Sequence, residues 1–319
     1  MLYRTTAIIA LFLSVPVSSE AQAQRRQKKA AVSERTLALY EPGEFNGLKY
    51  RLMKPIEFDA KKTYPLILSL HGAGGKGTDN VKNLRNWNEY LADEALRRKH
   101  PCFVLAPQSA VMWNDPTSPV VDSPDLSAEA IASWPPAWRS RIDRYRQRPL
   151  SSTEGNLHTV LRLIDEKLSK QFKIDADRIY CIGHSMGGFG TFTAVYQHPD
   201  RFAAAIPTAG GFPPWRDASR IKDVPIWTFH GAADRVVPTD FTRYVFDQMK
   251  ELGGNMKYTE LRAVAHGASA IAFKYTGDNA KEGYITQRAS DRPDKTSDVW
   301  VWLFKHRLSQ RSRTQPPTP

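Results

Sequence analysis

The chain of 319 residues contains only two cysteines, Cys102 and Cys181. Two cysteines permit one disulfide at most, which excludes a small fold held together by several disulfides. Both cysteines lie inside apolar segments, PCFVLAPQ and RIYCIGHS. We therefore expect two buried, small hydrophobic side chains rather than a disulfide pair.

A membrane-spanning run is also missing from the N-terminus, where the apolar stretch AIIALFLSVPV is too short to cross a bilayer. Arg4 precedes this stretch, and AQA at 21–23 supplies small residues for cleavage. The pattern favours an export signal at 1–23 over a buried N-terminal helix, with a basic linker at 24–35. We expect an exported protein, periplasmic or secreted, without stable membrane insertion after signal removal.

The chain is basic, with a formal net charge of +12, but it lacks zinc-finger spacing and an aromatic RNA-binding signature. We therefore expect no nucleic-acid partner. The positive excess lies in RRQKK at 25–29, in WRSRIDRYRQR at 138–148 and in KHRLSQRSR near the C-terminus. For the arginines between Arg139 and Arg148, a solvated charged face is favoured over a site for an acidic glycan.

Strand-like and helix-like segments alternate along most of the chain, which is typical of a mostly parallel sheet with helices on both faces. Apolar or alternating runs predict strands at 48–55, 64–72, 102–108, 178–183, 202–210, 224–231 and, as the last strand, 257–266. Helical spacing and end signals predict helices at 91–99, 157–172, 186–198, from about 238 to 253, and at 298–308. The fold class expected is therefore α/β.

Two segments interrupt this alternation, 111–152 and 275–297. The first is rich in tryptophan and proline and too long for a plain connection, so we expect a cap-like insertion. Its tryptophans, Trp113 among them, either line a substrate pocket or hold the cap together. The expected domain covers 36–308, with a disordered tail at 309–319.

An apolar strand-like run ends in Gly183-His184-Ser185-Met186-Gly187. The spacing G-x-S-x-G between a strand and a helix is the nucleophile elbow, a sharp turn whose neighbours must be small. Ser185 would then stand at the carboxyl end of the sheet, at the N-terminus of a helix that favours negative charge. The motif alone is weak, so partner residues must support it.

A serine hydroxyl needs a histidine to take its proton, and that histidine needs a carboxylate to orient it. In this type of fold the order along the chain is serine, acid, histidine. Asp234 in FHGAADRVVP and His266 in RAVAHGAS each follow a predicted strand. Asp234 is favoured over the other acidic candidates, which are Asp240, Asp217 and Asp200.

The remaining histidines are less suitable as the base. His71 and His230 precede glycines at strand ends and are expected to brace loops, while His184 is tied beside Ser185 and cannot easily turn back to it. The two others considered lie on or near helices, namely His158 and His198.

Two backbone N–H groups are expected to bind an oxyanion. One belongs to Met186, the residue after the predicted nucleophile, and the other to Ala73, with Gly74 as the alternative, in the glycine-rich stretch LHGAGGKG. A phosphate-binding loop is disfavoured because GAGGKGT lacks the spacing of that motif.

The combination of LHGAGGKGTDN, DRIYCIGHSMGGFGTF, PIWTFHGAADRVVP and VAHG resembles the α/β-hydrolase superfamily. More narrowly, it is similar to secreted bacterial carboxylesterases and predicted peptidases, related to polyhydroxybutyrate depolymerase-like and feruloyl esterase-like enzymes. The resemblance covers about 36–308 apart from the two interruptions. It implies Ser185, Asp234 and His266 as the catalytic residues, Ala73 and Met186 as oxyanion donors, and neither a cofactor nor a metal.

The strand order of that superfamily places the strand of LILSLHG between those of the two cysteines. One intervening strand separates the two sulfurs by about 10 Å, which is beyond disulfide reach. The resemblance therefore supports two free thiols.

These observations predict an exported serine hydrolase that cleaves carboxylic esters through an acyl-enzyme, with a small-molecule or glycan ester as substrate. Gly74 and Trp113 are the candidate substrate contacts. A serine peptidase of prolyl-oligopeptidase type and a non-catalytic binding protein on the same fold stay open as alternatives.

Overall fold

The structure is a computed structural model that describes residues 32–120, 125–140 and 155–311. The predicted export signal, most of the basic linker and the end of the tail lie outside these residues, as do the arginines between 141 and 148.

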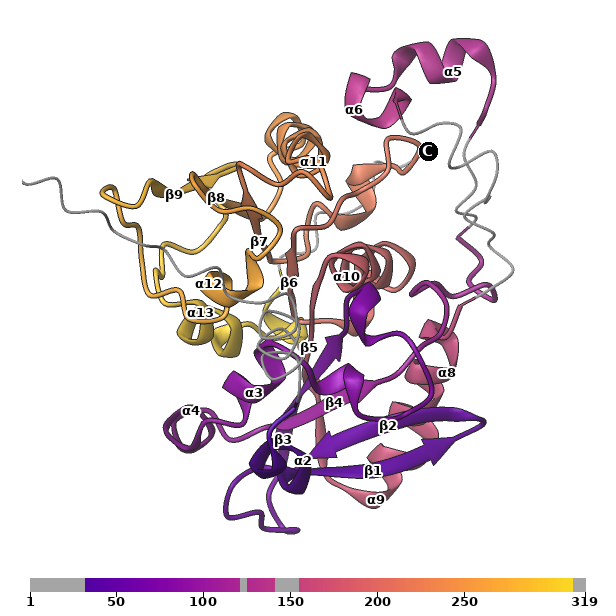
Figure 1. The fold of residues 1–319 in the computed structure, drawn as a ribbon, viewed down its shortest axis with the longest axis vertical. Helices are drawn as coiled ribbons and strands as arrows, with labels where there is room; N and C mark the ends of the chain where they lie inside the picture. The colour runs from indigo at the N-terminus through magenta and orange to yellow at the C-terminus, as the bar shows by residue number, and fades with distance from the viewer. Residues whose placement is uncertain (1–31, 121–124, 141–154, 312–319) are drawn as a thin grey trace, which may run out of the picture. The chain divides into compact units, whose positions relative to one another are not determined.

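The described residues form one sheet of nine strands (Figure 1). The strands are β1 (Tyr40–Phe45), β2 (Leu48–Met53), β3 (Tyr64–Leu70), β4 (Phe103–Pro107), β5 (Ile174–His184), β6 (Ala204–Thr208), β7 (Ile226–Gly231), β8 (Met256–Leu261) and β9 (Tyr284–Arg288). Their spatial order is β1-β2-β4-β3-β5-β6-β7-β8-β9.

The six strands from β4 to β8 in that order run parallel, whereas β1 and β2 at one end of the order and β9 at the other pair antiparallel. The expected mostly parallel sheet is confirmed. One expectation was wrong: β8 is not the last strand, because β9 pairs with it, Tyr284 opposite Leu261 and Arg288 opposite Lys257. The segment 275–297 thus contributes an edge strand, whose short alternating pattern at 284–288 was not recognised.

The α-helices are α2 (Glu34–Leu39), α3 (Trp87–Leu91), α4 (Glu94–Lys99), α5 (Ala128–Ser133), α6 (Pro136–Arg139), α8 (Leu157–Arg162), α9 (Ser169–Gln171), α10 (Met186–Gln197), α11 (Asp240–Glu251), α12 (Ser269–Ala272) and α13 (Val299–Lys305). The 3₁₀ turns are η1 (Ala73–Gly75), η2 (Lys82–Leu84), η4 (Pro199–Arg201), η5 (Ala218–Ile221) and η6 (Leu308–Gln310), and η3 (Leu163–Leu168) is a π-helix. The helix predicted at 157–172 is thus α8, η3 and α9 in succession.

Side chains alternate between the two faces of the sheet, as the pleat requires. Along β3, Leu66 and Leu68 join the core beneath α8, α10 and α11, whereas Ile67 joins the core beneath α3, α12 and α13. Figure 1 shows α10 lying beside β5 and β6. Because both faces of the sheet are covered by apolar cores, polar side chains collect in the loops at the carboxyl ends of the parallel strands.

The two cysteines are buried and free, as expected. Cys102 precedes β4 and joins one core, while Cys181 in β5 joins the other, and β3 lies between their strands. Burial raises the pKa of both thiols to about 12. The sulfurs therefore serve as packing groups on opposite faces of the sheet.

The described part of the insertion at 111–152 is anchored at its start. The backbone of Asp115 exchanges two hydrogen bonds of 3.0 Å with the side-chain amide of Gln197, at the end of α10. The Asp115 carboxylate lies 2.8 Å from His198 Nε2 and accepts from the hydroxyl of Thr117. These polar contacts bind the segment to the end of α10.

The later part of the same insertion packs through aromatic rings. Trp138 of α6 stacks on Phe241 of α11, with ring centroids 3.9 Å apart and planes within 11°. Trp134 and Trp138 are almost fully buried and share a small core with Phe241 and Val237. The tryptophans at 134 and 138 therefore hold the insertion against the loop and helix that follow β7.

The described fold extends slightly beyond the expected bounds of 36 and 308. At the start, Ser33 caps α2 and its backbone N–H donates to Glu89. At the end, Ser309 donates to Asp177 and Arg311 donates to the carbonyl of Pro199. Residues 309–311 therefore belong to the described fold, and the rest of the predicted tail lies outside the described residues. None of the helices among the described residues is long and apolar enough to cross a membrane.

Lys257 in β8 is buried between two tryptophans, with its ammonium 3.3 Å from the ring centroid of Trp227 and 6.0 Å from that of Trp302. Its Nζ donates to the carbonyl of Thr296 at 2.6 Å. Burial lowers the pKa of Lys257 from 10.5 to about 8. A lowered pKa means that protonation at this site opposes folding below about pH 8, and that this penalty disappears as pH rises toward 10.5.

We predict that Lys257→Met removes part of the rise in unfolding free energy between pH 8 and pH 10.5, a contribution of up to about 3 kcal/mol. Urea unfolding across this pH window measures the slope. Lys281→Met, at an exposed lysine, is the matched control and should keep the wild-type slope. An identical slope in Lys257→Met and wild type would contradict the assignment.

Candidate active site

Ser185 stands at the turn between β5 and α10 with φ 56° and ψ −117°, a conformation that costs about 1–3 kcal/mol for a residue with a side chain. Its backbone N–H donates to the carbonyl of Thr208 at 2.9 Å, and its carbonyl accepts from the N–H of Phe189 at 2.9 Å. These two bonds hold the turn from both sides. The side chain is half-buried at the carboxyl edge of the sheet.

The glycines around Ser185 have no space for a side chain, because backbone atoms of neighbouring segments lie against their Cα atoms. A Cβ at Gly187 would lie 1.8 Å from the carbonyl oxygen of Leu70, and one at Gly183 would lie 2.3 Å from that of Gly187. A Cβ at Gly188 would lie 2.4 Å from the carbonyl oxygen of Thr208. The turn therefore fits between β3 and β6 only without these side chains.

Asp234 lies in a tight turn after β7 that is hydrogen-bonded to the loop after β8. The N–H groups of Ala232 and Ala233 donate to the carbonyls of Leu261 and Val264 at 2.9 and 3.1 Å. A Cβ at Gly231 would lie 2.1 Å from the carbonyl oxygen of Val264. Glycine at 231 thus allows the Asp234 turn and the His266 loop to approach each other closely.

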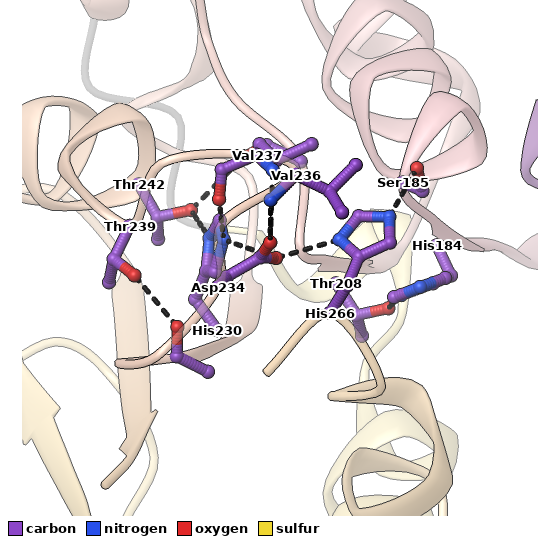
Figure 2. Close-up of polar contacts among 12 residues, drawn as sticks. His184, Ser185, Thr208, His230, Asp234, Val236, Val237, Thr239, Thr242 and His266 are labelled. Carbon is purple, nitrogen blue, oxygen red and sulfur yellow. Dashed lines mark hydrogen bonds and ion pairs between the residues drawn. The ribbon is translucent and has the colours of Figure 1, made fainter. Parts of the chain in front are cut away.

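The structure brings Ser185, Asp234 and His266 together from three loops (Figure 2). His266 Nε2 lies 2.9 Å from Ser185 Oγ, and His266 Nδ1 lies 2.7 Å from Asp234 Oδ2. A carboxylate only accepts, so Nδ1 carries the hydrogen and Nε2 accepts from the serine hydroxyl. Asp234 has no exposed side-chain surface, while 26% of the His266 side chain is exposed.

Donors surround both oxygens of the Asp234 carboxylate. Oδ1 accepts from the backbone N–H groups of Val236 and Val237 at 2.8 and 2.9 Å. Oδ2 accepts from His266 at 2.7 Å and also lies 3.2 Å from His230 Nε2. Burial by itself raises the pKa of Asp234, but these hydrogen bonds outweigh burial and hold the pKa well below its ordinary value. Asp234 is therefore ionised across the physiological range.

The stretch predicted to supply a second oxyanion donor forms the turn η1 directly after β3. A Cβ at Gly72 would lie 3.5 Å from Ser185 Cβ and 3.1 Å from the carbonyl oxygen of His184, so this turn runs beside the serine. Ala73 and Gly74 are exposed. Met186 is the first residue of α10, where a backbone N–H has no acceptor within its own helix.

His71 and His184 lie near Ser185, but neither ring is hydrogen-bonded to the serine hydroxyl as His266 is. His184 Nδ1 lies 3.0 Å from Thr208 Oγ1, and its ring centroid lies 4.9 Å from that of His266. Burial, with His266 as the next contribution, lowers the pKa of His184 to about 3, which keeps the ring neutral. His71 accepts at Nε2 from the N–H of Ser109 and therefore braces the loop after β4.

Trp113, which the sequence offered as a pocket residue or a packing residue, is 2% exposed. Its indole N–H donates to the carbonyl of His71 at 3.1 Å, and its ring lies against Gly190, where a Cβ would be 2.4 Å from Trp113 Cβ. The structure therefore favours the packing role for Trp113.

A cavity of about 600 Å³ adjoins the His266 loop. Its wall includes His184 and Gly267, together with aromatic residues of α3 and the chain after α12, Trp87, Tyr90 and Phe273. Ser185 is not among the residues that line it. Among the described residues no group of three or more His, Cys, Asp or Glu side chains is arranged to hold a metal ion.

Sequence reasoning assigned His230 only to bracing a loop. The structure places His230 Nε2 3.2 Å from Asp234 Oδ2, and no sequence motif distinguishes this position from one that only braces a loop.

Comparison with known proteins agrees with this architecture. Residues 132–274 match the sequence model of the family described as Phospholipase/Carboxylesterase. A solved structure of a thermostable esterase is 30% identical, with a TM-score of 0.62, and the match covers 85% of this chain and 64% of that one. The expected resemblance to the α/β-hydrolase carboxylesterases is confirmed.

Two curated relatives match shorter stretches. Acyl-protein thioesterase 1 homolog 2 from Dictyostelium discoideum is 28% identical over 137 residues, which are 41% of this chain and 61% of the relative. Cutinase est1 from Thermobifida alba is 32% identical over 117 residues, which are 36% of this chain and 38% of the relative. The match thus spans less than two thirds of either relative.

We predict that Gly187→Ala lowers the unfolding free energy by roughly 3 kcal/mol or more, because its methyl group would press on the Leu70 carbonyl and force β3 and α10 apart. Gly74→Ala is the control: a Cβ there meets nothing within 4 Å, and the change in stability should stay within about 0.5 kcal/mol. Thermal and urea unfolding measure both. Equal stability of the two variants would contradict the close approach of β3 and the elbow.

Proposed function

We propose that this chain, an α/β hydrolase related to the carboxylesterases, is an exported serine esterase that cleaves carboxylic esters with a catalytic triad of Ser185, Asp234 and His266. The observation that carries the proposal is the continuous pair of hydrogen bonds from Ser185 Oγ to His266 and from His266 to Asp234, 2.9 and 2.7 Å long. Hydroxyl, imidazole and carboxylate in this order are the groups that acyl transfer requires.

In the first half of the reaction Ser185 Oγ attacks the ester carbonyl carbon while His266 Nε2 takes the hydroxyl proton. The imidazolium that forms is stabilised by Asp234, which is ionised and hydrogen-bonded to Nδ1. The tetrahedral intermediate then expels the alcohol, and His266 returns the proton to the departing oxygen. The acyl group is left on Ser185.

In the second half a water molecule attacks the acyl-enzyme, with His266 again as the base. Collapse of the second tetrahedral intermediate releases the carboxylic acid, and His266 returns the proton to Ser185. Each intermediate carries negative charge on the former carbonyl oxygen. The backbone N–H groups of Met186 and Ala73 are proposed to bind this oxygen, Met186 from the N-terminus of α10 and Ala73 from the turn beside Ser185.

The positive φ of Ser185 supports the same assignment. Strain of this kind is retained where the surrounding structure enforces it, and here it directs the hydroxyl toward His266 rather than along the helix. A small-molecule or glycan ester is the proposed substrate class. The cutinase and thioesterase relatives act on esters and thioesters by name, which is consistent with this class.

We predict that Ser185→Ala lowers kcat for short p-nitrophenyl esters by about 10⁴-fold or more while the fold is retained, because the acyl acceptor is lost. Hydrolysis rates and circular dichroism measure both properties. A fluorophosphonate probe should label wild type and leave the variant unlabelled.

Ser290→Ala is the control, because this hydroxyl donates to the carbonyl of Gly254 and lies outside the proposed triad. It should keep wild-type turnover and labelling. Turnover that survives in folded Ser185→Ala, or a wild type that neither hydrolyses esters nor reacts with the probe, would remove the proposed function.

We also predict that a bacterial host exports the full-length chain and cleaves it after Ala23, because 1–23 has the basic start, apolar run and small-residue site of an export signal. Mass spectrometry of the periplasmic fraction should find a protein that begins at Gln24. A version lacking residues 2–23 should stay in the cytoplasm. Recovery of the full-length chain with Met1 from the cytoplasm alone would contradict export.

A further inference from the structure

The Asp234 carboxylate is shared between two histidines. His266 Nδ1 lies 2.7 Å from Oδ2 and faces Ser185, while His230 Nε2 lies 3.2 Å from the same oxygen on its buried side (Figure 2). His230 is completely buried at the end of β7. It has no contact with Ser185, so any effect on the reaction must pass through Asp234.

The hydrogen on His230 Nε2 follows from its neighbours. Besides Asp234 Oδ2, Nε2 lies 3.0 Å from the carbonyl oxygen of Val237. A carbonyl and a carboxylate can only accept hydrogen bonds. Nε2 is therefore protonated and divides its hydrogen bond between the two oxygens.

The other nitrogen of the same ring depends on one hydroxyl. His230 Nδ1 lies 2.7 Å from Thr242 Oγ1, which in turn lies 3.1 Å from the carbonyl oxygen of Gly210. A threonine hydroxyl has a single hydrogen. If it donates to Nδ1, the ring is neutral. If it donates to Gly210, the contact at Nδ1 is a hydrogen bond only when Nδ1 carries a second hydrogen, and the ring is then a cation.

The two states would affect Asp234 differently. A cation at His230 would neutralise the carboxylate that must stabilise the imidazolium of His266, whereas a neutral ring donates one hydrogen bond and leaves the negative charge in place. The 2.7 Å distance between Thr242 Oγ1 and Nδ1 allows the hydroxyl to donate to the ring, and this arrangement belongs to the neutral ring. The hydrogen bond from His230 also contributes to the low pKa of Asp234, after the opposing effect of burial.

We propose that His230, held as the neutral Nε2–H tautomer by the Thr242 hydroxyl, is a positioning residue that orients Asp234 and sets how strongly it supports His266. This inference rests on the proposed function and adds a second histidine to it. The network then runs from Ser185 through His266, Asp234 and His230 to α11. A strand end and a helix distant from the substrate thereby influence the reacting serine.

The test compares two substitutions of the same ring. His230→Leu removes the donor to Asp234, and we expect kcat to fall about 10- to 100-fold with KM unchanged, because His230 is buried away from substrate. With one donor fewer, Asp234 attracts the proton on His266 more strongly, so the acidic limb of the kcat/KM profile moves to higher pH. His230→Gln, which can place an amide N–H where Nε2 stood, should restore most of kcat and the wild-type limb.

A merely structural role predicts a different pattern. Equal losses in the leucine and glutamine variants, or a folded leucine variant with wild-type kcat and pH profile, would overturn the proposal. His306→Gln is the control: this half-buried histidine packs on Trp302, far along the chain from the triad, and should lower stability without moving the acidic limb.

A second variant covers the case in which His230→Leu does not fold. Thr242→Val removes the hydroxyl at constant shape, so the ring loses its partner at Nδ1, and kcat should fall with KM unchanged. Wild-type kcat in folded Thr242→Val would overturn the role of Thr242 in the proposal.

The tautomer is measured without catalysis. In Ser185→Ala labelled with ¹⁵N-histidine, the nuclear magnetic resonance spectrum at neutral pH should show His230 protonated at Nε2 and not at Nδ1. A doubly protonated ring, or one protonated at Nδ1 alone, would overturn the proposal. If wild type has no esterase activity, the proposed function fails, while this spectrum still decides whether His230 donates to Asp234.

Discussion

The backbone of Ser185 is the constraint on which the rest of the site depends. A residue with a side chain adopts φ 56° only when its surroundings enforce it, and here the Thr208 carbonyl and the first turn of α10 do so. The turn also requires Gly187 to lie against Leu70 and Gly188 against Thr208. Because β3 and β6 flank β5 in the sheet, the position of the hydroxyl is set by three neighbouring strands at once.

The two loops that face Ser185, after β7 and after β8, are hydrogen-bonded to each other. The Asp234 turn bonds to the strand and loop that lead to His266, and Gly231 removes the side chain that would keep the two apart. The carboxylate then has donors on both oxygens, which keeps it ionised although it has no exposed surface. A buried carboxylate without these donors would become protonated and lose its charge.

The insertion after β4 is held to the rest of the structure by polar and aromatic contacts that do not involve Ser185, Asp234 or His266. The insertion after β4 is fastened by Asp115 to the end of α10 and by Trp138 to Phe241 of α11. The same helix, α11, carries Thr242, which contacts His230. The insertion and the buried side of Asp234 are therefore both in contact with residues held by α11. On the far side of β8, the edge strand β9 extends the sheet, and the loop after β8 contains His266.

The sequence by itself determined the α/β class, most strands and helices, and the three residues proposed for catalysis. Strand periodicity, the glycines around Ser185 and the order of Asp234 and His266 along the chain are local signals, and each depends on residues close together in sequence. The edge strand β9 was not predicted because its five residues are exposed or only half-buried, and such residues carry little hydrophobic signal.

Only the tertiary structure decided which face each cysteine occupies, that Trp113 is a packing residue, and that His230 lies against Asp234. Each of these depends on contacts between segments distant in sequence or on the path of a turn, and a residue's type does not encode them. A histidine before a glycine reads the same whether it faces solvent, a loop or a buried carboxylate. The packing of β7, β8 and α11 around it makes the difference.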